Sequence, residues 1–384
     1  MNNKIPYGRH HVTNDDIKEV LGVLKSDFLT QGPFVKKFEL AFAKYIGSKY
    51  AVAVSNGTAA LHLCTTVLNV SKGDKIITTP ITFAATANCI RYCGGEVVFA
   101  DINSENYLLD INKVRKLIED SPKGTYKGII PVDLAGRACD LEAFRDLANK
   151  HGLWLIEDSC HSPGGYFIDS KSKTQRCGNS VYADLAIFSF HPVKHIAAGE
   201  GGMITTNNKK LYNKLLNLRT HGIQQDSSLK KENHGVWHYE MQELGYNYRL
   251  NDIQSALGLS QLKRAGQGIK RRKEIASYYK DFFENKDYIL GHSGFIEGHA
   301  YHLYIIEVKN RDGLINYLRN KNIVAQVHYI PLHLMPYYKK LGWKKGDFPN
   351  AELYYSRALS VPIYPTLSKN ELNRVTSEIE LFYN

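Results

Sequence analysis

The sequence predicts an α/β protein in which helices flank a mostly parallel sheet, followed by a smaller carboxyl-terminal α+β unit. The first observation is that short β-branched runs alternate with helical stretches through two-thirds of the chain, as in parallel sheets covered by helices. The second is a change after Leu250 to a long helical stretch rich in Lys and Arg. With 384 residues, 43% of them hydrophobic, the chain has the length for two or three domains.

Seven short runs are expected to form the strands of the sheet. They cover residues 51–55, 75–79, 96–100, 128–132, 153–157, 184–189 and 202–206. Apolar residues at helical spacing predict helices at residues 58–68, 83–93, 111–119 and 141–150. Before them, Thr13 followed by Asp15 and Asp16 has the pattern of a helix N-cap with acidic residues in the first turn. We therefore expect an amino-terminal arm and helix over residues 1–25 and a large α/β domain over residues 26–250.

The carboxyl-terminal region, residues 251–384, is expected to form a linking helix and a small α+β domain. One long helix is predicted over residues 252–283. Strands at 301–308 and 323–328, a helix at 312–320 and a last helix from Ser368 follow it.

Composition and charge exclude several classes of protein. The chain has 49 Lys and Arg against 38 Asp and Glu, so its formal net charge is +11. The basic residues occur in short scattered groups, which favours solvated helix faces and a small anionic substrate over a nucleic-acid groove. No apolar run is long enough for a signal peptide or a membrane span. The six cysteines lack metal-site spacing, so we expect reduced thiols, no metal and a cytoplasmic protein without a membrane partner.

Three segments that directly follow predicted strands carry residues suited to chemistry. In open parallel sheets, ligands bind at the carboxyl ends of strands and at helix amino termini. The segment 55–60 is a turn of small residues that opens a helix, Asp158 follows another strand, and Lys194 lies in a loop near several glycines. Each has an ordinary alternative, since Gly-Thr helix starts are common and an Asp at a strand end can cap the next helix.

Together the three segments supply what a pyridoxal phosphate (PLP) enzyme requires. The cofactor needs a phosphate anchor, an anionic partner for its ring nitrogen and an amine that forms a Schiff base. Asp158 has to stay ionised for the second role, and Lys194 has to lose its proton for the third.

Longer motifs extend this pattern over nearly the whole chain. They are SNGTAALH, TPITFAATAN, LIEDSCH, SFHPVK with GEGG, and LGYNYRLNDIQSALGLSQL, with PYGRH at the start and LSVPIYPTLS near the end. The chain resembles the DegT/StrS nucleotide-sugar aminotransferases. This resemblance implies the aspartate-aminotransferase-like fold, PLP fold type I, with residues 26–250 as the PLP-binding domain. Some relatives carry a histidine in place of the Schiff-base lysine and are dehydratases, and Lys194 counts against that branch.

The resemblance implies roles for eight residues. Lys194 corresponds to the catalytic Schiff-base lysine and Asp158 to the carboxylate that faces the pyridine nitrogen. The other positions are His161 at the phenolic oxygen, Phe83 on the ring face, Gly57, Thr58 and Ser189 at the phosphate, and Asn247 at the phosphate of the neighbouring subunit. A homodimer with shared active sites follows. Taken alone, Phe83 could be a core aromatic, His161 a donor at a helix start, Ser189 a strand-end filler and Asn247 a turn residue.

The resemblance also implies a reaction. The amino group of L-glutamate is transferred to C4 of a UDP-4-keto-6-deoxy-N-acetylhexosamine, giving a UDP-4-amino-4,6-dideoxy sugar and 2-oxoglutarate, in pseudaminic acid or surface-glycan biosynthesis. PLP cycles through pyridoxamine 5′-phosphate. Arg9, Arg249 and His328 are candidate substrate contacts, each equally open to a structural role. The alternatives are a GDP-perosamine-type or UDP-arabinose-type aminotransferase, a sugar dehydratase, a regulatory binding protein and, on charge alone, a nucleic-acid binder.

Overall fold

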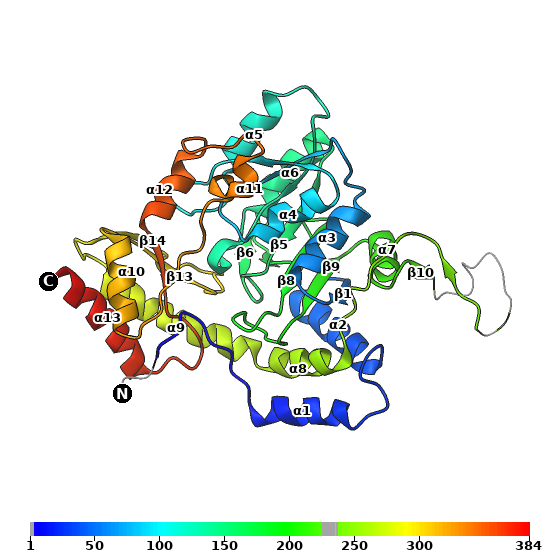
Figure 1. Ribbon diagram of the computed structural model, residues 1–384, viewed down its shortest axis with the longest axis horizontal. Coiled ribbons are helices and arrows are strands. Elements are labelled where there is room, and N and C mark those ends of the chain that lie inside the picture. Colours follow the sequence, from blue (N-terminus) through cyan, green and yellow to red (C-terminus); the bar gives the residue numbers. More distant parts are fainter. Residues whose placement is uncertain (1–3, 225–234, 236) are drawn as a thin grey trace.

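A seven-stranded sheet forms the centre of the molecule (Figure 1), for which a computed structural model describes residues 4–224, 235 and 237–384. All neighbouring strands run parallel except β9, which is antiparallel to both β1 and β8. The expected mostly parallel α/β sheet is therefore confirmed, and each of the seven expected runs is a strand. In sheet order they are β1 (Tyr50–Val54), β9 (Gly202–Thr206), β8 (Leu185–Ser189), β5 (Trp154–Asp158), β4 (Tyr126–Ile130), β2 (Lys75–Thr78) and β3 (Glu96–Phe99).

Helices flank this sheet, as the alternation predicts. Four lie close to their expected ranges: α3 (Gly57–Val67), α4 (Ala84–Tyr92), α5 (Ile111–Glu119) and α6 (Leu141–His151). The sequence analysis missed α2 (Pro33–Ile46) and α7 (Lys209–Arg219), and the short pairs β6 (Tyr166–Ile168) with β7 (Thr174–Arg176) and β10 (Ile223–Gln224) with β11 (Glu240–Met241). Helix α2 has standard end signals, Pro33 at its first position and Gly47 in the left-handed conformation after its end.

The amino-terminal helix α1 (Asn14–Leu24) begins where the N-cap pattern predicts. Both α1 and α2 pack against α8 (Asp252–Lys263), which is followed directly by α9 (Ala265–Phe283). The expected single helix over 252–283 is therefore wrong, because the backbone of Arg264 leaves the helical region at φ −114° and ψ 10°. Two glycines, Gly266 and Gly268, lower the helix propensity just after this break.

The carboxyl-terminal region contains a three-stranded antiparallel sheet of β12 (Ile289–His292), β13 (Tyr304–Val308) and β14 (Ala358–Val361). Its helices are α10 (Arg311–Asn320), α11 (Pro336–Lys339), α12 (Pro349–Arg357) and α13 (Lys369–Tyr383), the last capped by Ser368 as expected. Strand β13 begins later than predicted because Tyr301 has a φ of +49°, which an extended strand cannot accommodate. The expected strand at 323–328 is wrong: the segment makes only single bridges, from Ile323 to Ile5 and from Gln326 to Ser360, so no continuous ladder forms.

The buried side chains form one core around the large sheet, a second between α9, α13 and the small sheet, and a third where α2 and α8 pack on β1, β8 and β9. Leu303, Tyr338 and Tyr354 from the carboxyl-terminal region belong to the first core, so the domain boundaries 1–25, 26–250 and 251–384 stay a prediction. All six cysteines are unpaired thiols. Among the described residues, no helix is both long enough and apolar enough to cross a bilayer.

Candidate active site

Asp158 is anchored at the carboxyl end of β5, where it is 5% exposed. One carboxylate oxygen accepts a hydrogen bond of 2.7 Å from the hydroxyl of Thr86 on α4, and the other accepts one of 3.2 Å from the N–H of Cys160. A second hydroxyl, that of Thr82, lies 2.8 Å from the hydroxyl of Thr86. The carboxylate is therefore held in one orientation. Because β5 is followed by a turn and β6, the alternative that Asp158 caps a helix is wrong.

Lys194 lies in the loop after β8 and is electrostatically coupled to Asp158. Burial lowers the pKa of the Lys194 amine, while the negative charge of Asp158 acts in the opposite direction. Burial also raises the pKa of Cys160 well above its ordinary value, so this side chain is a neutral thiol. An amine that loses its proton readily can act as a nucleophile and as a base, which is the property that the sequence analysis required.

His161 is buried beside Lys194 and fixed at both ring nitrogens. Its Nδ1 accepts a hydrogen bond from the N–H of Ala135 at 3.2 Å, which assigns the proton of the neutral ring to Nε2. Nε2 in turn lies 3.2 Å from the hydroxyl of Tyr329. Burial, followed by the nearby charge of Lys194, keeps the pKa of His161 well below its ordinary value. His161 is therefore a neutral hydrogen-bonding group at the pH of a cell, and it lies in a turn and not at a helix start.

Gly57, Thr58 and Ser189 meet where α3 begins and β8 ends. The side chain of Asn56 caps α3 by accepting from the N–H of Ala59, which leaves the first N–H groups of the helix at its open end. A Cβ atom at Gly57 would lie 3.1 Å from the Cβ of Ser189 and 3.5 Å from the Sγ of Cys160. Any larger side chain at Gly57 would therefore crowd Ser189. A helix amino terminus with free N–H groups suits a phosphate.

Phe83 lies at the N-cap of α4 and is 61% exposed, so the alternative that it is a core aromatic is wrong. Its ring centre is 6.2 Å from that of Tyr329. His328, beside Tyr329, is buried; its Nδ1 lies 2.9 Å from the hydroxyl of Ser360. Burial, followed by Lys194, lowers the pKa of His328 to about 3. The chain thus brings His328 into electrostatic contact with Lys194.

Asn247 does not join this group within one chain. Its neighbours Tyr246 and Tyr248 stack on each other with ring centres 4.9 Å apart, and Nδ1 of His62 on α3 lies 3.0 Å from the hydroxyl of Tyr248. Asn247, between the two tyrosines, is exposed. Among the described residues, no hydrogen bond joins Asn247 to the end of α3 or to Ser189.

The two candidate arginines lie in different places. Arg9 lines a cavity of about 250 Å³ that also includes Lys194. Arg249 lines another cavity, of about 520 Å³, together with Lys36 and Arg219. One chain therefore does not direct Arg9 and Arg249 at the same group.

Comparison with known proteins decides the family. A family model described as the DegT/DnrJ/EryC1/StrS aminotransferase family matches residues 10–380. The chain belongs to this family.

The similar proteins agree with this membership. A UDP-4-amino-4,6-dideoxy-N-acetyl-beta-L-altrosamine transaminase of Campylobacter jejuni is 36% identical over 95% of this chain and 93% of its own. The structure of Helicobacter pylori PseC, an aminotransferase involved in the biosynthesis of pseudoaminic acid, is 31% identical, covers 99% of both chains and has a TM-score of 0.87. The structure of Streptococcus pneumoniae Spr1654 in its PLP form is 28% identical. It covers 99% of this chain and 98% of its own, with a TM-score of 0.89. A more distant relative, 31% identical over 92% of both chains, is a GDP-perosamine synthase of Vibrio cholerae.

The protein is thus a sugar aminotransferase with the PLP fold type I architecture, in a family whose aminotransferases depend on PLP. The residues present fit that cofactor. A carboxylate with both oxygens held, an amine with a lowered pKa and a helix amino terminus with free N–H groups match its ring nitrogen, aldehyde and phosphate.

Sequence reasoning missed several residues of this aminotransferase site. Thr86 lies within the TPITFAATAN motif, three residues after Phe83 and so on the same face of a helix, which was an available signal. Tyr329 gave no signal, because its contact with His161 joins residues 168 positions apart. The ring of His302 packs at a tilt against that of His161, with ring centres 4.4 Å apart, and the ring centre of His195 lies 5.6 Å from that of His302.

A buried acidic pair lies below the site on the other side of β5. Asp133 and Glu157 are 0% and 1% exposed, and their carboxylates lie within 4.8 Å of each other and of the Cys177 thiol. Ser162 donates a hydrogen bond of 2.6 Å to Asp133, and Gly178 donates one of 2.9 Å to Glu157. Burial, then the charge of Asp133, raises the pKa of Glu157 well above its ordinary value. We interpret Glu157 as protonated and as donating to Asp133.

Proposed function

We propose that this protein transfers the amino group of L-glutamate to C4 of a UDP-4-keto-6-deoxy-N-acetylhexosamine, giving a UDP-4-amino-4,6-dideoxy sugar and 2-oxoglutarate in pseudaminic acid or surface-glycan biosynthesis. The observation that carries the transamination is a lysine with a lowered pKa, coupled to a fixed carboxylate at the carboxyl end of β5. The names of the Campylobacter jejuni transaminase and of Helicobacter pylori PseC support the acceptor. The net charge of +11 suits an acceptor that carries a diphosphate.

The mechanism assigns distinct tasks to the residues of the site. PLP, when bound, supplies an electron sink for the electron pair left on the α carbon of the donor. We propose that the Lys194 Nζ holds PLP covalently between turnovers and, once released, moves the proton taken from the α carbon of the donor. Asp158, kept in position by Thr86, is proposed to face the ring nitrogen, and Phe83 one face of the ring.

The remaining residues of the site are proposed to hold the cofactor and the sugar in position. His161, as a neutral donor at Nε2, is proposed to contact the phenolic oxygen, with Tyr329 holding its ring. Gly57, Thr58 and Ser189 are proposed to hold the phosphate at the start of α3. In the second half of the reaction, Lys194 delivers the proton to the sugar carbon that becomes aminated, and His328 is proposed to approach the sugar.

We also propose that the active enzyme is a homodimer. Tyr246 and Tyr248 pack toward His62 of their own chain, so Asn247 between them points to solvent. An exposed Asn247 is available to the phosphate site of a second copy. The proposed cytoplasmic location and the absence of nucleic-acid and membrane partners remain predictions.

The test is an absorbance spectrum of the purified protein and of its Lys194→Ala variant. We expect a PLP band in the wild type that glutamate shifts to that of the pyridoxamine form and that UDP-4-keto-6-deoxy-N-acetylhexosamine restores. The variant should not complete the cycle. A wild-type spectrum that glutamate leaves unchanged would contradict the proposal and favour a regulatory binding protein, whereas ammonia release without 2-oxoglutarate would favour a dehydratase.

A second candidate acceptor comes from the GDP-perosamine synthase of Vibrio cholerae. If a GDP-4-keto-6-deoxy sugar restores the spectrum and the UDP sugar does not, the reaction type stands and the nucleotide assignment is wrong. A UDP-arabinose-type acceptor is distinguished in the same way.

A further inference from the structure

The cavity of about 250 Å³ beside Lys194 has a strongly cationic wall. Four segments far apart in the sequence form it: the arm, the loop after β8, the residues of α8 and α9 around their junction, and the loop that contains Pro365. Its lining is Arg9, His10, His11, Lys194, His195, Ala197, Gln261, Arg264, Ala265, Gln267, Gly268, Arg271, Arg272 and Pro365. The wall thus contains four arginines and the proposed catalytic lysine, and neither an Asp nor a Glu.

Two of the four arginines already have carboxylate partners. Arg264 forms an ion pair with Asp16, and Arg271 one of 3.0 Å with Glu274. Arg9 is exposed, and no hydrogen bond or ion pair engages its side chain within the described residues. Arg9 is therefore free to bind a ligand that enters the cavity.

Arg272 is a buried guanidinium without a counter-ion in the described part of the chain. It is 2% exposed, and its Nη1 donates only to the neutral carbonyl oxygens of Tyr301, His302 and Ile363, at 3.1, 3.2 and 2.9 Å. Its Nε is buried and has no acceptor among the described residues. Burial lowers the pKa of Arg272 to about 10. A buried charge without an opposite charge is unfavourable, so an anion in the adjacent cavity would stabilise it.

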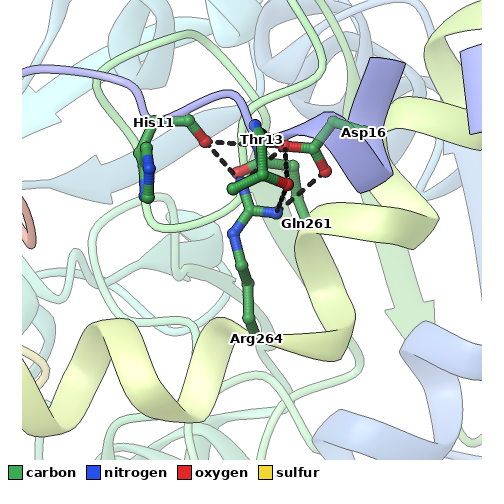
Figure 2. Close-up of polar contacts among 5 residues, drawn as sticks. All are labelled: His11, Thr13, Asp16, Gln261 and Arg264. Atoms are coloured by element: carbon green, nitrogen blue, oxygen red, sulfur yellow. Dashed lines mark hydrogen bonds and ion pairs between the residues drawn. The ribbon is translucent and has the colours of Figure 1, made fainter. Parts of the chain in front are cut away.

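The arm that carries Arg9 is fixed at the cavity by a polar network (Figure 2). Nη1 and Nη2 of Arg264 donate to the two oxygens of Asp16 at 2.8 and 2.6 Å. Gln261 donates to the carbonyl of His11 and to Asp16, both at 2.9 Å. Because His11 is two residues from Arg9, this network holds the backbone next to Arg9 against α8 and limits the positions that its guanidinium can reach.

We infer that this cavity is a subsite for an oxyanion of the substrates, with Arg9 in direct contact and Arg272 supplying the buried charge. The inference rests on the proposed transamination, which brings two anionic substrates to Lys194. The oxyanion is either a carboxylate of the amino donor or a phosphate of the sugar nucleotide, because a guanidinium binds both through paired hydrogen bonds.

Titration calorimetry on the PLP-loaded protein tests this inference without turnover. The probes are 2-oxoglutarate for the donor carboxylates and UDP for the diphosphate. In Arg9→Ala we expect one of them to bind about tenfold more weakly, the loss of one charge-assisted contact. Weaker binding of 2-oxoglutarate alone identifies the donor, and weaker binding of UDP alone identifies the nucleotide.

Two further variants make the result specific. Lys4→Ala removes one positive charge from the same exposed arm but not from the cavity, so it should bind both probes as the wild type does. Arg9→Lys keeps a charge and should recover part of the affinity, which a folding defect would not allow. If Arg9→Ala binds both probes like the wild type, the subsite is refuted even where the spectra support transamination. If the spectral cycle fails but Arg9→Ala still binds 2-oxoglutarate or UDP more weakly than the wild type, only the proposed reaction is refuted.

Discussion

Replacing Asp16 by Asn should release the amino-terminal arm from α8. The carboxylate is fully buried and accepts hydrogen bonds from the N–H of Thr13 at 2.8 Å, from Gln261 at 2.9 Å and from both Nη atoms of Arg264 (Figure 2). Asn cannot carry the negative charge, and one of its two polar atoms would direct N–H groups at the donors of Arg264 or Gln261. The matched control is Asp15→Asn, which removes an exposed charge from the same helix turn.

The size of the effect follows from the pKa of Asp16. Burial by itself would raise this pKa, but the hydrogen bonds from Arg264 and Thr13 lower it from 3.8 to about 2. A difference of this size corresponds to about 2.4 kcal/mol between the charged and neutral forms. Because the Arg264 side chain is 24% exposed, solvent screens part of it, and we expect a loss of about 1 to 2 kcal/mol in the free energy that holds the arm.

Hydrogen exchange of the α1 amides measures this free energy directly, because the arm can open without global unfolding. At neutral pH, Asp16→Asn should exchange about 5- to 30-fold faster in α1 than the wild type, and Asp15→Asn should remain within about twofold. The contribution of the carboxylate is present above its unfolded pKa of 3.8 and is lost as the pH falls through about 2. The difference between wild type and Asp16→Asn should therefore be constant above about pH 4 and shrink toward pH 2.

Equal exchange in Asp16→Asn and Asp15→Asn would refute the reasoning, because it would show that the buried ion pair does not hold the arm. The loss of a fixed arm should also weaken anion binding at Arg9, since Asp16 and Arg264 hold the backbone next to it. A variant that opens α1 but binds 2-oxoglutarate and UDP as the wild type does would contradict this link.

Three further predictions concern the site. Thr86→Val removes the hydroxyl that donates to Asp158 at 2.7 Å. A lost hydrogen bond to a charged group costs about 1.5–3 kcal/mol, so PLP should bind about tenfold more weakly or worse. Fluorescence titration of the apoenzyme with PLP measures this loss. Gly57→Ala places a Cβ 3.1 Å from that of Ser189, so the start of α3 and the end of β8 must move apart, and PLP should bind more weakly in the same titration. Glu157→Gln preserves a donor to Asp133. Because Glu157 stays protonated in the folded state but ionises when the chain unfolds, the stability of the wild type in urea should fall as the pH rises above 4.5. The variant should lack this pH-dependent loss of stability.

The sheet and its flanking helices could be predicted because their signals are local. Each strand of the large sheet is a short β-branched run, and the N-cap patterns at Thr13 and Ser368 mark the helices that they begin. Helix α2 was missed although its end signals, Pro33 and Gly47, are also local. Two other failures occur where distant contacts decide the local structure. The break at Arg264 accompanies its ion pair with Asp16, 248 residues away, and the segment 323–328 is divided between partners on the arm and on β14.

The residues of the site were predictable to the extent that their chemistry is carried by a motif. Lys194 and Asp158 follow strands of one sheet, and the rule that ligands bind at the carboxyl ends of such strands brings them together. The residues that tune them come from elsewhere: Thr86 from α4 and Tyr329 from the carboxyl-terminal region. No spacing in the sequence relates Thr86 to Asp158 or Tyr329 to His161, because only the folded topology places these pairs in contact.

The predicted site residues fall into two groups. Lys194, Asp158 and Arg9 come together within a single chain. Asn247 and Arg249 lie in an extended segment whose tyrosines face inward. Alternation along an extended backbone forces a residue between two inward-facing neighbours to the opposite side. The inward packing of Tyr246 and Tyr248 on His62 therefore presents Asn247 outward. The same contacts therefore leave the side chain of Asn247 exposed, as the proposed contact with a second copy requires.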